Sequence, residues 1–243
     1  MRRFTVKKEN IFETEAFLDF SERSHIVNVL RMKVGDKLIA TDGEGRDFVC
    51  EIAEISEESV KLAIIEETTN NADPKYDITI FQAAPKRDKL ELIIQKATEI
   101  GLSRLVPFQS KFCISKFDND KIARLSKISA EATKQCGRSI PLEICNVQTF
   151  GEMIISLSKY ECVIFAYEKA TSSLKEAINE YKNSNNGGKI AIVIGSEGGF
   201  SKEEAEKIAN LANVKCISLG SRILRLETAA ISLSAIISYE LEN

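Results

Sequence analysis

Residues that commonly hold metals are scarce in this chain of 243 residues. There is one histidine, and the six cysteines are scattered without any C-x-x-C pair. A lone histidine cannot complete a His-rich metal cluster, and cysteines spaced in this way are typical of reduced thiols, not of a zinc site or a disulfide framework. We therefore predict no metal cofactor and free, mostly buried thiols.

Long hydrophobic runs are also missing. No stretch of about eighteen uninterrupted apolar residues occurs, so a membrane-spanning helix is not expected. The first ten residues, MRRFTVKKEN, lack the apolar core of a secretion signal. Hydrophobic residues still make up 44% of the chain, which is enough for the core of one large domain or two. These features predict a globular, cytoplasmic protein with no membrane partner.

The common nucleotide-binding fingerprints are a third absence. The glycine-rich stretch IGSEGGFSKEE, at 194–204, contains no Gly-Lys-Ser/Thr sequence and lacks the G-x-G-x-x-G spacing. A nucleotide hydrolase is therefore disfavoured, because the phosphate-loop lysine and a metal-binding pattern are both missing.

Two strand-to-helix junctions near the C-terminus nevertheless have the layout of a ligand site. An apolar strand predicted at 189–194 leads into the glycine stretch, where Ser201 and Glu204 form a capping box ahead of the next helix. A second apolar strand, at 214–219, leads through the loop GSRILR to a helix predicted at 227–241. Ligands of parallel α/β sheets bind at such carboxyl ends, so we expect both loops to face a ligand.

The chain divides into two differently patterned parts. A polar seam, EETTNNADPKYD at 66–77, carries the Asn-Asn and Asp-Pro signals of a loop, and we place the boundary there, between domains 1–72 and 73–243. After the seam, strands and helices alternate, which predicts an α/β domain. Before it we predict a small β-barrel with three short strands, at 37–41, 48–55 and 60–65.

Charge is distributed unevenly along the chain. The formal net charge of −3 by itself argues against a nucleic-acid partner. Residues 1–72 carry 10 Lys and Arg against 15 Asp and Glu, a balance of −5, whereas residues 84–141 carry 12 against 6, a balance of +6. The basic segment is suited to face phosphate groups, although an ordinary solvated helix surface is the alternative interpretation.

The paired segments IGSEGGFS and LGSRILRLETA resemble the two signature segments of the ribosomal RNA small-subunit methyltransferase E family, a part of the SPOUT superfamily of S-adenosylmethionine-dependent enzymes. Two departures from the family pattern are Ser196, where Pro is commoner, and Phe112-Cys113, where an Arg-Ser pair is more usual. Three further segments resemble the family and occur in its order, at 24–36, 83–101 and 131–143.

The resemblance implies a fold and an activity. The implied fold is an α/β SPOUT-type C-terminal domain with a parallel sheet and a trefoil knot, preceded by a small PUA-like, RNA-binding β-barrel. The implied activity is S-adenosylmethionine-dependent methylation of N3 of a uridine in small-subunit (16S) ribosomal RNA. The substrate is free RNA or the assembled small ribosomal subunit, and the enzyme is a homodimer.

The two C-terminal loops would hold the cofactor, S-adenosyl-L-methionine, according to the same resemblance. Backbone amides and apolar side chains would contact its adenine, and glycines let the backbone approach a ligand closely. The residues implied in cofactor binding are Ile194, Gly195, Gly199, Leu219, Gly220, Ile223, Leu224 and Thr228.

Three residues are candidates for catalysis. Uridine N3 must lose its proton before it attacks, and a guanidinium that stabilises the resulting charge on the uracil oxygens contributes roughly 3–4 kcal/mol. Arg225 is the first candidate because it lies in the ligand loop between two leucines, and Arg138 is the second. Glu197 is suited to orient the base or accept its proton. For Arg138 and Glu197 the alternative interpretation is the stabilisation of a helix end by a charge of the right sign.

RNA contacts are assigned more broadly. Basic residues at the N-terminus, on the short helix predicted around 21–30, and in the basic middle segment form the candidate set, with solvated surface charge as the alternative for each. The candidates are Arg2, Arg3, His25, Arg31, Lys86 and Lys96.

Two other functions remain open from the sequence. A ribose 2′-O-methyltransferase of the same superfamily would share the cofactor pocket, although LGSRILRLETA favours base methylation. A non-enzymatic, RNA-binding ribosome assembly factor would use the barrel and the basic segment, with the glycine loop serving only as tight packing.

Overall fold

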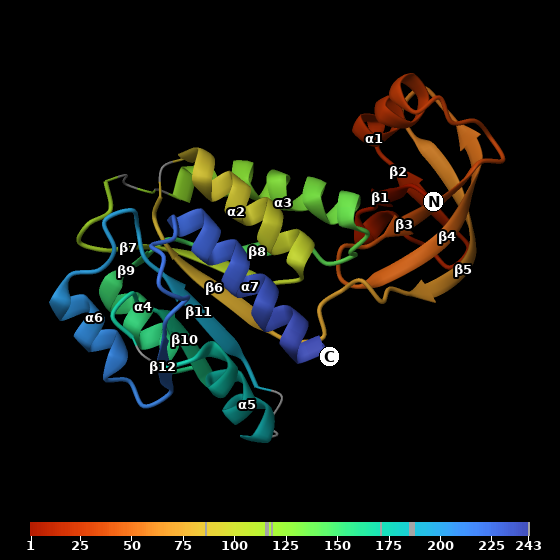
Figure 1. Ribbon diagram of the computed structural model, residues 1–243. Helices are drawn as coiled ribbons and strands as arrows, with labels where there is room; N and C mark the ends of the chain where they lie inside the picture. Colours follow the sequence, from red (N-terminus) through yellow and green to blue (C-terminus); the bar gives the residue numbers. More distant parts are fainter. Residues whose placement is uncertain (86, 115–116, 118, 171, 185–187, 243) are drawn as a thin grey trace. The chain divides into compact units, whose positions relative to one another are not determined.

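The computed structural model describes residues 1–85, 87–114, 117, 119–170, 172–184 and 188–242. The chain forms two compact units (Figure 1). Unit 1 comprises Met1–Asp73 and Thr133–Pro141, and unit 2 comprises Pro74–Ala132 and Leu142–Asn243. The chain therefore returns to the N-terminal unit at Thr133–Pro141, whereas the predicted division has a single boundary, after residue 72.

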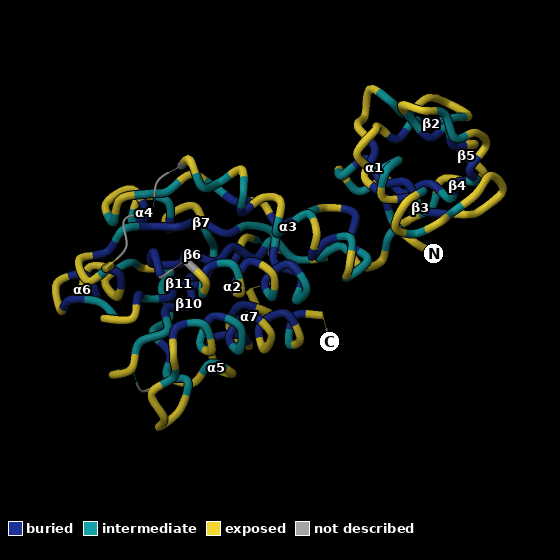
Figure 2. The backbone as a smooth tube through the Cα atoms, turned by 90° about the horizontal axis from the view of Figure 1, so that it is seen from above, coloured by how far each residue is buried: buried dark blue, intermediate teal, exposed yellow. Residues whose placement is uncertain are grey.

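Unit 1 is built on a five-stranded sheet with the order β1-β3-β4-β5-β2. Only the β1–β3 pair is parallel, and the edge strands β1 and β2 share no ladder. The backbone of the sheet curls round in Figure 2, as expected for a small barrel-like domain, and its buried residues form one hydrophobic cluster. Its strands are β1 (Arg3–Thr5), β2 (Glu15–Leu18), β3 (Lys37–Thr41), β4 (Arg46–Ile55) and β5 (Val60–Thr69). Its short helices are η1 (Lys8–Asn10), α1 (Phe20–Ser24) and η2 (His25–Val29).

A polar network holds the returning segment on this sheet. Ser139 Oγ donates to Asp47 Oδ1 over 2.5 Å and accepts from Asn70 Nδ2 over 2.6 Å. Arg3 pairs with the buried Asp47 and also donates to Ser139 Oγ over 2.9 Å. The backbone N–H of Ser139 donates to Asp73 Oδ1 over 3.0 Å. These bonds satisfy polar groups that would otherwise be costly to bury, and they explain why Thr133–Pro141 belongs to unit 1.

Unit 2 is built on a seven-stranded sheet in which every pair is parallel. The order is β12-β10-β11-β6-β7-β8, and β9 pairs with β7. Its strands are β6 (Ile78–Ala83), β7 (Arg104–Gln109), β8 (Glu143–Ile144), β9 (Gln148–Thr149), β10 (Cys162–Ala166), β11 (Ile190–Ile194) and β12 (Val214–Ile217). Its helices are α2 (Arg87–Ile100), η3 (Asn119–Lys121), α3 (Ile122–Cys136), α4 (Phe150–Leu157), α5 (Leu174–Ser184), α6 (Lys202–Ala209) and α7 (Leu226–Glu242), the end of α3 lying in unit 1.

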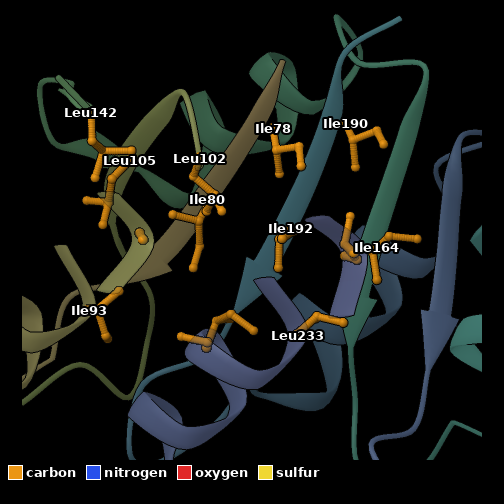
Figure 3. Close-up of a cluster of buried hydrophobic side chains, with 14 of the residues drawn as sticks. Ile78, Ile80, Ile93, Leu102, Leu105, Leu142, Ile164, Ile190, Ile192 and Leu233 are labelled. Atoms are coloured by element: carbon orange, nitrogen blue, oxygen red, sulfur yellow. The ribbon is translucent and has the colours of Figure 1, made fainter. Parts of the chain in front are cut away.

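Both faces of this sheet are buried, which explains its nearly continuous apolar strands. Along β11, Ile190, Ile192 and Ile194 pack into the cluster that includes side chains of α2, α5 and α7. Figure 3 shows part of this cluster, with Ile192 among its labelled residues. Ala191 and Val193 point the other way, into the cluster that includes side chains of α4 and α6. The sheet is therefore held rigidly between two helical layers.

The alternation of strands and helices predicted after the seam is present in the structure. The final helix was predicted at 227–241 and is α7, and the capping box of Ser201 and Glu204 begins α6. Helix α5 was not predicted, and neither were the short strands β1 and β2.

The six cysteines are free thiols, and the expectation that most of them are buried is wrong. Cys50 and Cys162 are buried, whereas the other four are partly exposed. Burial raises the pKa of Cys50 and of Cys162 to about 11. Among the described residues, no cluster of three or more His, Cys, Asp or Glu side chains is arranged to hold a metal. Within the same residues, no helix is long and apolar enough to span a membrane.

Truncation of the central strand β11 should destabilise the protein strongly. Ile192 is fully buried, so Ile192→Ala is expected to lower the free energy of unfolding by about 2–5 kcal/mol, through lost burial and the cavity that remains. Ile155→Ala is the matched control, because Ile155 is 68% exposed and the change there should cost less than about 0.5 kcal/mol. Urea unfolding measures both, and equal losses would contradict the assignment of the core.

Candidate functional site

A cavity of about 670 Å³ lies where β10, β11 and β12 end. Its volume is in the range of pockets that hold small molecules and cofactors. Residues 166–169 line it after β10, residues 194–200 after β11, and residues 218–226 after β12. The three loops meet because parallel strands present their carboxyl ends at the same edge of a sheet.

The glycine loop after β11 is closely packed at two positions. A Cβ on Gly198 would lie 2.8 Å from Phe112 Cβ, and a Cβ on Gly195 would lie 3.0 Å from the ring of Phe200. Gly199 has a φ of +68°, a conformation that glycine adopts without strain. The loop is also fastened to β6, since Gln82 Nε2 donates to the carbonyl of Gly195 over 3.1 Å.

Helix α6 starts directly after this loop, with the capping box that the sequence predicts. The hydroxyl of Ser201 accepts from the N–H of Glu204 over 3.3 Å, and the Glu204 carboxylate accepts from the N–H of Ser201 over 3.0 Å. The same carboxylate accepts from the backbone N–H of Lys111 over 2.8 Å. Glu204 is only 8% exposed, so it joins the loop after β7 to the start of α6.

The loop between β12 and α7 forms the apolar and cationic side of the pocket. Leu219 is half-buried against the main core, whereas Ile223 is 91% exposed and also lines the pocket. Gly220 has a φ of +103°, which allows the chain to turn there. Arg225 is exposed at the pocket, one residue before α7 begins.

A charged cluster lies beside the pocket. Lys89, in the first turn of α2, has its Nζ atom 3.2 Å from Glu197 Oε1 and 3.4 Å from Glu227 Oε2. Glu197 belongs to the glycine loop, and Glu227 lies in the first turn of α7. Three segments that are distant in the sequence therefore meet through one ammonium group.

The pocket brings together most of the residues that the sequence assigns to the cofactor. Thr228 is exposed and is not among the residues that line the pocket. Of the catalytic candidates, Arg225 and Glu197 line the pocket. The predicted cofactor residues that line it are Ile194, Gly195, Gly199, Leu219, Gly220, Ile223 and Leu224.

Arg138 has a different environment from the other two catalytic candidates. It belongs to unit 1, its side chain is only 2% exposed, and its Nε atom lies 3.9 Å from Asp73 Oδ1. Burial lowers the pKa of the Arg138 guanidinium. These contacts give Arg138 a structural place in the network of the returning segment.

The predicted RNA-contact residues differ in their exposure. Arg2 and His25 are exposed, and so is Arg31, which has a φ of +55°. Arg3 is mostly buried and paired with Asp47, as described above. Lys96 pairs with Glu99 on the same helix over 2.9 Å. Lys86 lies outside the described residues.

Sequence reasoning missed two parts of the pocket. Residues Tyr167, Glu168 and Lys169 line it after β10, and the carboxyl-end rule applied to that strand would have found them. Lys89 also lines it, and no local pattern indicates that its partners are two glutamates more than a hundred residues away.

Comparisons with known proteins identify the class and then the family. Residues 71–238 match the RNA methyltransferase domain, and residues 18–65 match the RNA methyltransferase PUA domain. The ribosomal RNA small subunit methyltransferase E of Bacillus subtilis is 34% identical, over 100% of this chain and 98% of its own length. The enzyme of the same name from Rickettsia conorii is 33% identical, over 87% of this chain and 84% of its own.

Solved structures share the fold over nearly the whole chain. A crystal structure titled as a hypothetical protein has a TM-score of 0.86 and 32% identity, covering 99% of both chains. A ribosomal RNA small subunit methyltransferase E from Neisseria gonorrhoeae, bound to S-adenosyl methionine, has a TM-score of 0.85 at 23% identity, covering 98% of this chain and 97% of that one. Unit 2 thus carries an RNA methyltransferase domain. The chain belongs to the ribosomal RNA small subunit methyltransferase E family.

Removal of the Glu204 carboxylate tests how the site is supported. Glu204→Ala should lower the free energy of unfolding by about 1–2 kcal/mol, because it leaves the N–H groups of Ser201 and Lys111 without their acceptor. Glu206→Ala, on the exposed face of the same helix, is the control and should stay within about 0.5 kcal/mol of the parent. Chemical denaturation compares them, and a Glu204 variant as stable as the control would refute this role.

Proposed function

We propose that this chain methylates N3 of a uridine in small-subunit ribosomal RNA, with S-adenosylmethionine as the methyl donor. Membership of the small subunit methyltransferase E family supports ribosomal RNA as the substrate. The observation that carries the proposal is the pocket at the ends of β10, β11 and β12, which both signature loops line. Base specificity at N3 is inferred from the similarity of LGSRILRLETA to the base-methylating family.

The residues of the pocket suit the proposed cofactor. The glycine loop lines the pocket, and its Gly195 and Gly198 pack closely against the side chains of Phe200 and Phe112. Leu219, Ile223 and Leu224 supply apolar surface for an adenine ring. Bound there, the cofactor would supply an electrophilic methyl group, and the task of the protein is to orient the acceptor toward it.

Two side chains at the pocket are suited to act on the uridine. The exposed guanidinium of Arg225 can stabilise the negative charge that develops on the uracil oxygens when N3 loses its proton. Glu197 can orient the base or accept that proton, since its carboxylate lies at the pocket next to Lys89. We assign no catalytic role to Arg138, because its side chain is buried beside Asp73 in unit 1.

The remaining parts of the proposal concern RNA and assembly. The PUA match in unit 1 and the exposed Arg2, His25 and Arg31 support RNA binding by that unit. We further propose the trefoil knot of the SPOUT superfamily for unit 2, and a homodimer. Helix α7 supports the dimer, because Leu233 and Ile237 are buried in the core whereas Ile236, on the same helix, is 45% exposed.

Two substitutions separate catalysis from cofactor binding. Arg225→Ala should lower the rate of methyl transfer by about 100- to 1,000-fold, since one oriented donor is lost. Its dissociation constant for S-adenosylmethionine should change by less than about threefold. Gly195→Val should raise that dissociation constant at least about tenfold, because the added side chain meets Phe200.

Calorimetry measures the binding of the cofactor, and labelled S-adenosylmethionine with small ribosomal subunits measures the transfer. Lys175→Ala, an exposed change on α5, is the control for both assays. Equal losses of binding and transfer in the two site variants would contradict the division of roles. A wild-type protein that binds no S-adenosylmethionine in the calorimeter would contradict the proposed function itself.

A further inference from the structure

Lys89 joins the two ligand loops from a third segment of the chain. Its ammonium lies between a carboxylate of the glycine loop and one in the first turn of α7, at 3.2 Å and 3.4 Å. The side chains of Lys89, Glu197 and Glu227 are 29%, 22% and 16% exposed, so the cluster is largely shielded from water. We propose that Lys89 is a positioning residue that keeps the two loops at the spacing that the ligand requires.

The charges of the cluster show why one lysine can have this effect. Carboxylate oxygens of Glu197 and Glu227 both lie within 3.4 Å of the Lys89 ammonium. Oxygens that both lie within 3.4 Å of the same nitrogen are close enough to repel each other strongly when that nitrogen is removed. The lysine is therefore needed for the glycine loop and the start of α7 to approach each other.

Glu227 has little other support for its charge. Its Oε2 atom is buried and accepts no hydrogen bond among the described residues, so the Lys89 ammonium supplies the compensating charge. The N-terminal position on α7 adds a smaller favourable contribution from the helix dipole. Loss of Lys89 would thus leave an uncompensated carboxylate at the base of the second ligand loop.

The arrangement also fixes the orientation of Glu197. This residue is part of the loop whose backbone must stay open to the ligand, and Lys89 itself lines the pocket. In the proposed function, which this inference extends, Lys89 would influence both the affinity for S-adenosylmethionine and the placement of Glu197. It would do so without contact with the uridine.

The first test needs no ligand. In Lys89→Met, hydrogen–deuterium exchange of peptides covering 194–204 and 218–229 should accelerate about tenfold, because local opening of both loops becomes easier. Peptides of β6 and β7 should be unchanged. Lys215→Met is the matched control, since it breaks an ion pair with Glu180 elsewhere in unit 2. Unchanged exchange in both loops would overturn the inference, whatever the function of the protein.

The second test uses the cofactor. Lys89→Met should weaken the binding of S-adenosylmethionine about tenfold, and Lys89→Arg, which keeps the charge, should stay within about threefold of the wild type. The KM for the ribosomal substrate should change little. If the wild type and Lys89→Met bind S-adenosylmethionine equally well, the inference is rejected and the proposed function is not. If the wild type does not bind S-adenosylmethionine, the proposed function is rejected.

A double substitution separates charge from packing. Adding Glu227→Gln to Lys89→Met removes the repulsion and should restore most of the lost affinity and loop protection. If Lys89 served only to pack α2, the second change would restore nothing.

Should Lys89→Met fail to fold by circular dichroism, Glu197→Gln and Glu227→Gln test the sharing of one ammonium. The double variant should then change loop exchange by less than the sum of the two single changes. A change equal to that sum would refute the cluster.

Discussion

The parallel pairing of β10, β11 and β12 is the constraint on which the site depends. In this register β10 ends at Ala166 against Ile217 of β12, and Phe165 lies opposite Val193 of β11. Three loops that are separate in the sequence therefore leave the sheet at one edge and enclose a common cavity. Because both faces of the sheet are buried under helices, packing on both sides holds the strand ends in place.

The loops in turn depend on polar contacts made at their ends. Glu204 joins the start of α6 to the loop after β7, Gln82 fastens Gly195 to β6, and Lys89 links the glycine loop to α7. Each contact uses a residue that is charged or amide-bearing and at least partly buried, so its loss costs more than an exposed ion pair would. The open backbone of the glycine loop is thus stabilised from outside the pocket.

Local sequence patterns predicted the elements and loops of unit 2 well, and long-range contacts poorly. The capping box of Ser201 and Glu204 is a local signal, and so is the apolar periodicity that places α7. Helix α5 offers only Ala177, Ile178 and Tyr181 as buried positions, too few for a clear periodic pattern, and β1 has three residues. The pairing of β1 with β3 is also parallel and joins segments distant in the sequence, which local patterns do not reveal.

The same distinction explains the candidate site. Arg225 and Glu197 were found because they lie in the loops themselves, whereas the surroundings of Arg138 and Lys89 depend on tertiary contacts. The central claim is that this pocket serves methyl transfer to a uridine base. Its most direct test is mass spectrometry of nucleosides from small ribosomal subunits that lack their uridine methylation, after incubation with the protein and labelled S-adenosylmethionine. We expect label on N3 of uridine; label on a ribose oxygen, or cofactor binding with no transfer to any form of the RNA, would contradict methyl transfer to the base.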